Sequence, residues 1–255
     1  MAANLVYQNT TLVGSTKTGV LKPDANGYYE LVLGAFDYFN SSDAFYTLEP
    51  FKMLLMSSSN LMRRVNRGAL RSEYGHPIFT SNMSKRDVIL RVLNIQEDRT
   101  CAHIKSIALD EQRIINNGQK VAAVIGMVKP SGPMGDALAQ QLENPDENVC
   151  FSVRSLTDDT RNSAGTLIKA VKEIVTWDYV NEPGIDVATK YHSPSLEMYS
   201  FDNDDLKAAE NRALEYGVGM ESAQEILTHL IKNNVSPLEA RRALRGTRPN
   251  SAGWR

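Results

Sequence analysis

The chain has 255 residues, 42% hydrophobic and 23% charged, which is typical of a globular protein with room for one large domain and a small appendage. A formal net charge of -2 at pH 7 provides no long-range field for nucleic acid or an anionic membrane. No stretch approaches the length of an apolar membrane span and no signal-peptide pattern opens the chain, so we expect neither membrane insertion nor secretion. Cys101 and Cys150 lie in apolar runs and are predicted to be buried free thiols in a reducing cytoplasm.

The N-terminal part of the chain carries signals for strands and then for a helix. A turn cluster at residues 24–27 precedes an aromatic and β-branched run at 28–33, and residues 1–35 are predicted to be rich in strands. Residues 57–71 offer capping residues followed by apolar positions, which indicates a helix. We expect the arginines of that helix to form a solvated basic face.

Residues 101–128 predict an antiparallel hairpin. Residues 101–109 alternate in polarity, the turn sequence Asn116-Asn117-Gly118 follows, and residues 121–128 form a second apolar run. The preceding residues 84–95 are left unassigned, with a short helix capped by Ser84 as one alternative.

The next segment predicts a helix followed by strands. A helical stretch at 136–143 stops at Asn144-Pro145, and residues 149–155 and 173–180 have strand composition. Proline, glycine, serine and aspartate then mark residues 183–203 as linker-like.

After about residue 200 the signals are helical only. Ser222 and Glu225 form a capping box, and Ser236-Pro237 followed by Glu239 has the pattern of a second helix start. We therefore expect a domain at 1–185, a linker at 186–203 and a helical C-terminal appendage at 204–255.

Several catalytic and ligand-binding classes are excluded by missing residues. Gly14 and Gly19 have the outer spacing of a phosphate-binding loop, but Val20-Leu21 stands where lysine and a hydroxyl residue are required. No serine-hydrolase elbow, β-lactamase set or zinc-protease motif occurs, and the four histidines are too scattered to predict a metal site. We expect no cofactor and no metal.

Ser152 is the serine with a physical argument for catalysis. On a strand, Cys150, Ser152 and Arg154 share one face, so a hydroxyl and a guanidinium would project together from a rigid element. The alternative is a half-buried strand that carries a hydrogen-bonded serine and a solvated arginine.

Five short motifs follow one another between about residues 65 and 185. They are Arg71-Ser-Glu-Tyr-Gly75-His76-Pro77, Cys101-Ala-His103-Ile, Gly132-Pro-Met-Gly135, Val149-Cys-Phe-Ser152-Val-Arg154-Ser155 and Val175-Thr-Trp-Asp178-Tyr-Val-Asn-Glu-Pro183. In this order they resemble the motifs of the tailed-phage prohead proteases of the giant-phage type, which are capsid-maturation serine proteases whose fold is shared with the herpesvirus assemblins. Departures from the family pattern include Cys150 in place of glycine, Val153 in place of a second serine and Gly184 in place of serine.

The resemblance implies an α+β protein with a mostly antiparallel, closed β-barrel surrounded by helices. It makes Ser152 the nucleophile, because alignment on Arg154 leaves Val153 at the other serine position. His76 is implied as the general base, and Asp178 is favoured as the group that orients it, with His103 as the competing third member. Arg154 is a candidate for stabilising the oxyanion, directly or through water, and a structural salt bridge is the alternative role.

The function implied by the resemblance is a maturation endopeptidase inside a phage procapsid in the host bacterial cytoplasm. Its substrates would be scaffold and capsid proteins and the enzyme itself, and it would act as a homodimer or a higher oligomer, without nucleic acid or membrane. Two rivals stay open: an inactive structural component of the procapsid that retains the fold, and a binding module whose helical tail recruits a partner.

Giant-phage members of this family prefer a small residue two positions before a cleaved glutamate, and this resemblance implies self-cleavage. Glu197 lies in the proline-containing linker, where an extended substrate is accessible, and is the favoured site at which the active enzyme would remove its own helical tail. The arginine-rich end of the tail would dock the precursor to an acidic scaffold partner. The small-x-Glu pattern fits Glu197, Glu210, Glu215, Glu221 and Glu225.

Overall fold

The computed structural model describes residues 5–7, 10–13, 22–40, 43–56, 58–114, 120–144, 146–181, 199–216 and 221–234. Their strands are β1 (Leu5–Tyr7), β2 (Thr10–Val13), β3 (Tyr29–Phe36), β4 (Tyr38–Phe39), β5 (Phe45–Tyr46), β6 (Arg71–Glu73), β7 (Thr100–Ile114), β8 (Lys120–Pro130), β9 (Cys150–Arg161), β10 (Leu167–Val180) and β11 (Tyr199–Phe201). The helices are α1 (Leu48–Leu54), α2 (Asn60–Asn66), α3 (Lys85–Leu93), α4 (Gly135–Glu143), α5 (Asn203–Tyr216) and α6 (Glu221–Asn234), with a 3-10 turn at Glu97–Arg99. None of these helices is long and apolar enough to cross a membrane.

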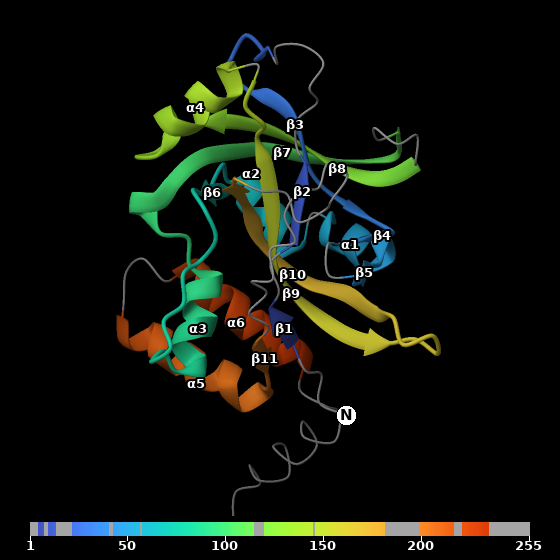
Figure 1. The fold of residues 1–255 in the computed structure, drawn as a ribbon. Helices are drawn as coiled ribbons and strands as arrows, with labels where there is room; N and C mark the ends of the chain where they lie inside the picture. The colour runs from blue at the N-terminus through green and yellow to red at the C-terminus, as the bar shows by residue number, and fades with distance from the viewer. Residues whose placement is uncertain are drawn as a thin grey trace, which may run out of the picture.

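The described strands form two sheets. One sheet has the order β11-β1-β9-β10-β5-β4, with β2 also paired to β9, and the other has the order β3-β8-β7-β6. Every pair of strands is antiparallel except the short pair β10 and β5. Figure 1 shows the long pair β9 and β10 running from beneath β7 and β8 down past the helices α3, α5 and α6.

The two sheets approach each other at two places. Tyr74, just after β6, forms an isolated parallel bridge with Tyr179 on β10, and β2 packs against β3 on the other side. The predicted α+β class with mostly antiparallel sheets is confirmed. The predicted closure is not observed, because the described strands belong to two separate hydrogen-bonded ladders and form a curled half-barrel.

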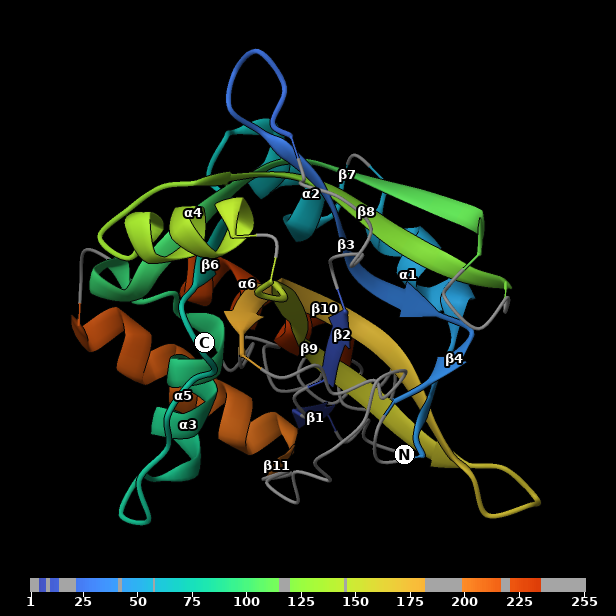
Figure 2. The same ribbon diagram turned by 45° about the horizontal axis from the view of Figure 1, so that its top comes forward.

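The apolar core has two parts. The larger one lies between the sheets and beneath α1, α2 and α4, with Phe51, Phe151 and Trp177 fully buried. The smaller one joins α3, α5 and α6 to Leu156 on β9 and Val175 on β10. The predicted C-terminal appendage is helical over its described residues, and it shares this second core with the rest of the chain (Figure 2).

Most of the predicted elements are found. The strand at 28–33 is β3, the hairpin at 101–128 is β7 and β8, the helix at 136–143 is α4, and the strands at 149–155 and 173–180 belong to the longer β9 and β10. The turn at 116–118 and the second tail helix lie outside the described residues. Both cysteines are free and buried.

Three local expectations are settled by the structure. The unassigned residues 84–95 contain α3, and the Ser84 side chain caps its first turn by accepting a hydrogen bond from the Asp87 backbone N–H. The predicted linker contains β11, because residues 199–201 pair with β1. The solvated basic face of the 57–71 helix is wrong at Arg64, which is buried and donates to the carbonyl oxygens of Ile174 and Val175 on β10.

The turn between β8 and α4 provides a test of the fold. Gly132 has φ +85°, and a Cβ there would lie 2.7 Å from the Thr100 carbonyl oxygen, whereas Gly165 has φ +82° in open space. Alanine at either position costs about 1 kcal/mol for the left-handed backbone. Gly132→Ala should cost roughly a further 1–3 kcal/mol because the backbone must shift, as measured by urea unfolding. Equal losses for the two variants would contradict this packing.

Candidate active site

The pairing of β9 with β10 places two predicted site residues side by side. Ser152 is the register partner of Asp178, and Arg154 is the partner of Thr176. All of these residues are fully buried. The expectation of a half-buried strand with a solvated arginine is therefore wrong, since β9 is covered on both faces along residues 150–157.

Arg154 binds Asp178 through two parallel hydrogen bonds. Its Nε donates to Oδ2 of Asp178 at 2.8 Å and its Nη2 donates to Oδ1 at 2.7 Å. Nη2 also lies 3.1 Å from the Glu73 carboxylate, while Nη1 donates to the carbonyl oxygens of Val92 and Asn94 at 3.3 and 3.0 Å. Because these contacts use the five N–H groups of a guanidinium, Arg154 is committed to protein partners.

The carboxylate of Asp178 is held between charges of both signs. Burial raises its pKa to about 6, and the Arg154 guanidinium opposes that rise by stabilising the ionised form. Oδ1 accepts a further hydrogen bond from the Glu73 backbone N–H at 3.2 Å. Asp178 therefore has a fixed orientation in the core next to Ser152.

The loop that carries His76 is attached to the same end of β10. The backbone N–H of Gly75 donates to the Tyr179 carbonyl oxygen at 2.7 Å, and that of Tyr74 donates to the Arg99 carbonyl oxygen at 2.8 Å. Gly75 has φ +81°, which favours glycine, and the reversal at this residue directs the chain into His76-Pro77. The start of the His76 loop is thus bonded to Tyr179, the residue that follows Asp178 on β10.

His76 is kept neutral by its surroundings. Burial and the nearby charge of Arg154 lower its pKa to about 4, because both disfavour an imidazolium. Its Nδ1 is buried and makes no hydrogen bond within the part of the chain that the structure describes. A neutral imidazole of this kind can accept a proton, and the loop that carries it is bonded to β10 through Gly75 and Tyr179, the residue that follows Asp178.

A third strand lies along β9. β2 pairs with β9 in antiparallel register, and Thr11 is the backbone partner of Ser152. Ser152 is completely buried in this structure.

His103 belongs to a different environment. It lies on β7 between Arg71 on β6 and Lys129 on β8, and its Nδ1 is 3.0 Å from the Tyr28 hydroxyl. Burial, followed by the charge of Arg71, lowers its pKa. The structure therefore gathers Ser152, Asp178, Arg154 and the His76 loop, and it gives His103 partners elsewhere.

One acidic and one basic residue next to Arg154 were not identified as site residues from the sequence. Glu73 and Arg91 form a two-point ion pair next to Arg154, with N···O distances of 2.9 and 2.7 Å. A local pattern does not reveal such a pair, because its members lie on β6 and α3 and meet through tertiary packing. Among the described residues no group of three potential metal-ligating side chains is present.

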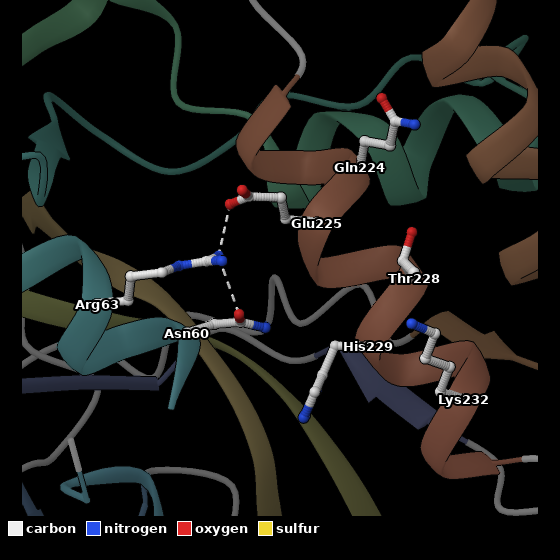
Figure 3. Close-up of a pocket in the computed structure, with 7 residues that line it drawn as sticks. All are labelled: Asn60, Arg63, Gln224, Glu225, Thr228, His229 and Lys232. Carbon is white, nitrogen blue, oxygen red and sulfur yellow. Dashed lines mark hydrogen bonds and ion pairs between the residues drawn. The ribbon is translucent and has the colours of Figure 1, made fainter. Parts of the chain in front are cut away.

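The candidate self-cleavage residues divide into two environments. Glu210 and Glu215 lie in α5, and Glu225 lies in α6, where it forms an ion pair with Arg63 of α2 at 2.5 Å (Figure 3). Glu221 is the first residue of α6, and Glu197 lies outside the described residues. Since a protease binds extended chain, the packed helices are poor substrates in this fold.

Comparison with known proteins places the chain in a family. The family model of the Peptidase S80 family matches residues 7–232, and the chain belongs to that family. A capsid maturation protease of Pseudomonas phage phiKZ is 39% identical over 199 residues, which cover 76% of this chain and 72% of that protein. The bacteriophage T4 capsid assembly protease gp21 is a similar solved structure, with a TM-score of 0.48 and 13% identity over 69% of this chain and 98% of that one.

The electrostatics of His76 predict an unusual titration. With a folded pKa of about 4 and an ordinary value of 6.5, the unfolded chain binds a proton more readily between these limits. Stability should therefore fall as the pH drops from 6.5 towards 4, and less so in His76→Gln. We expect the His76 ring resonances, assigned in NMR spectra by their loss in that variant, to titrate near pH 4. A midpoint near 6.5 would contradict this environment.

Proposed function

We propose that this protein is a capsid maturation protease of the serine type, which cleaves phage scaffold and capsid proteins. Membership in a peptidase family and likeness to the phiKZ capsid maturation protease support the class of activity. The observation that carries the serine mechanism is the convergence of Ser152, Asp178 and the His76 loop at one end of β9 and β10.

In this mechanism the Ser152 hydroxyl oxygen attacks the scissile carbonyl carbon. His76 accepts the hydroxyl proton and returns it to the leaving amine as the carbon–nitrogen bond breaks. Water then attacks the carbonyl carbon of the acyl-enzyme, and His76 accepts a proton from the water. His76 passes that proton to the Ser152 oxygen as the ester carbon–oxygen bond breaks and the carboxylic acid product leaves. The low pKa of His76 keeps it available as a base over the physiological range, and its catalytic hydrogen bonds form when substrate is bound.

Asp178 remains the third member of the catalytic triad in this proposal. It is fixed beside Ser152, and its Oδ2 accepts one hydrogen bond, from Arg154 Nε, which leaves a lone pair for a second donor. His103 lies on β7, in the sheet that does not contain Ser152, and its Nδ1 is 3.0 Å from the Tyr28 hydroxyl, so it is the weaker candidate. Arg154, whose donors are committed, would stabilise an oxyanion by its charge or through water rather than by direct contact.

The substrate preference and the setting follow the family resemblance. We propose cleavage after glutamate in small-x-Glu sites, inside the procapsid in the host cytoplasm, by a homodimer or higher oligomer. The competing proposal, an inactive capsid component with the same fold, is disfavoured because a lapsed enzyme has no chemical reason to retain the three residues. Treatment with diisopropyl fluorophosphate distinguishes the two, since only an active serine protease is labelled at Ser152.

Substitution of the nucleophile should abolish proteolysis without unfolding the protein. Ser152→Ala removes one oxygen and leaves little cavity, so the loss of cleavage should exceed about 1000-fold at nearly unchanged stability. His76→Ala should be about as damaging. Cleavage of a peptide containing Ser-Leu-Glu measures the rate, and residual cleavage by Ser152→Ala would place the nucleophile elsewhere.

The third member is decided by comparing Asp178→Asn with His103→Ala. We expect weak residual activity in Asp178→Asn and a smaller loss in His103→Ala, because only Asp178 lies beside Ser152. Since the asparagine also weakens the Arg154 ion pair, the rate must be normalised to the folded fraction from circular dichroism. A larger normalised loss in His103→Ala would reverse the assignment.

Self-cleavage after Glu197 is proposed to leave the tail docked. β11 pairs with β1, and α5 and α6 share a core with α3, so cutting the chain before residue 199 breaks none of these contacts. The wild type should yield two fragments by denaturing mass spectrometry that elute together from a native sizing column. Ser152→Ala and Glu197→Gln should stay intact at this bond. A cut upstream of Glu182, or fragments that separate under native conditions, would contradict the proposal.

A further inference from the structure

The Glu73 carboxylate connects three elements around the candidate site. Oε1 accepts from Arg91 Nη1 on α3 at 2.9 Å and from the Gln96 backbone N–H at 2.6 Å. Oε2 accepts from Arg91 Nη2 at 2.7 Å and lies 3.1 Å from Arg154 Nη2 on β9. Glu73 is completely buried, so each of its four acceptor positions is used by a protein donor.

The backbone of Glu73 adds a connection to the catalytic strand. Its N–H donates to Asp178 Oδ1, the same oxygen that accepts from Arg154 Nη2. Glu73 also stands three residues before His76, and the two intervening residues are bonded to Arg99 and Tyr179. The position of Glu73 therefore sets both the Asp178–Arg154 pair and the start of the His76 loop.

Charge balance makes this arrangement stable only as a unit. Two guanidiniums, of Arg91 and Arg154, face two carboxylates, of Glu73 and Asp178, in a buried region. Burial alone would raise the pKa of Glu73, but Arg91 and Arg154 outweigh it and hold the pKa below its usual value. Removal of one charge leaves another without compensation in the core.

We propose that Glu73, anchored by Arg91, is a positioning residue for the peptidase reaction, acting on Asp178 through Arg154 and on His76 through the chain. This inference rests on the proposed serine mechanism and deepens it. Glu73 touches no substrate, so its loss should displace the reacting groups. Displacements of about 1 Å can cost about 100-fold in rate.

The test compares two buried glutamates that each pair with an arginine on a helix. Glu173→Gln is the matched control, because Glu173 is buried and lies 3.5 Å from Arg64 on α2, away from Arg154. We expect Glu73→Gln to lower kcat by about 10- to 100-fold with KM changed less than about twofold, and Glu173→Gln to leave kcat within about threefold. Urea unfolding should show a larger loss of stability for Glu73→Gln than for Glu173→Gln, because Arg91 and Arg154 hold the pKa of Glu73 low whereas burial raises the pKa of Glu173 to about 7, so each kcat is normalised to the folded fraction.

Labelling of the full chain by diisopropyl fluorophosphate distinguishes a failure of the Glu73 proposal from a failure of the serine mechanism on which it rests. The wild type should be labelled at Ser152, at a rate that falls in Glu73→Gln and not in Glu173→Gln. If Glu73→Gln does not fold, Arg91→Met replaces it, with Arg91→Lys expected to restore part of the rate. Wild-type labelling with equal rates for both glutamate variants overturns the positioning role alone. Absence of wild-type labelling at Ser152 overturns the serine mechanism and this inference together.

Discussion

The buried guanidinium of Arg154 is the constraint on which the site depends. A charge in the core must be compensated, and here the compensation comes from β6, β10 and the end of α3. These elements are far apart in sequence, so satisfying one side chain fixes their relative positions. Within this arrangement the β9–β10 register places Asp178 beside Ser152, and the Gly75 backbone N–H bonds the His76 loop to the end of β10.

Helix α3 extends this constraint to the C-terminal helices. Its C-terminal end provides Arg91 and the carbonyl oxygens that bind Arg154, and its apolar residues pack against α5 and α6. Lys85 near its start forms an ion pair with Asp205 of α5 at 3.1 Å. The tail helices therefore pack against the element that binds Arg154.

The sequence predicted the elements whose signals are local. Alternating polarity identified β7, strand-like composition identified β8, β9 and β10, and the break at Asn144-Pro145 identified the end of α4. Strand periodicity drew attention to Ser152, and motifs in chain order selected His76, Ser152 and Asp178. The burial of Arg64 and the pairing of Glu73 with Arg91 were not predictable, because a charged residue on a helix looks solvated until its tertiary partners are known.

The charge balance also defines what Asp178 can contribute. Its carboxylate forms an ion pair with Arg154, and the Glu73 carboxylate forms ion pairs with Arg91 and Arg154. The net charge of these two carboxylates and two guanidiniums is zero. The pKa of the resting His76 is lowered first by its burial and then by the charge of Arg154. In the proposed serine mechanism, Asp178 would act mainly through orientation, by accepting a hydrogen bond in a fixed direction, and less through charge. The rigidity supplied by Arg154 and Glu73 is then what makes that orientation dependable.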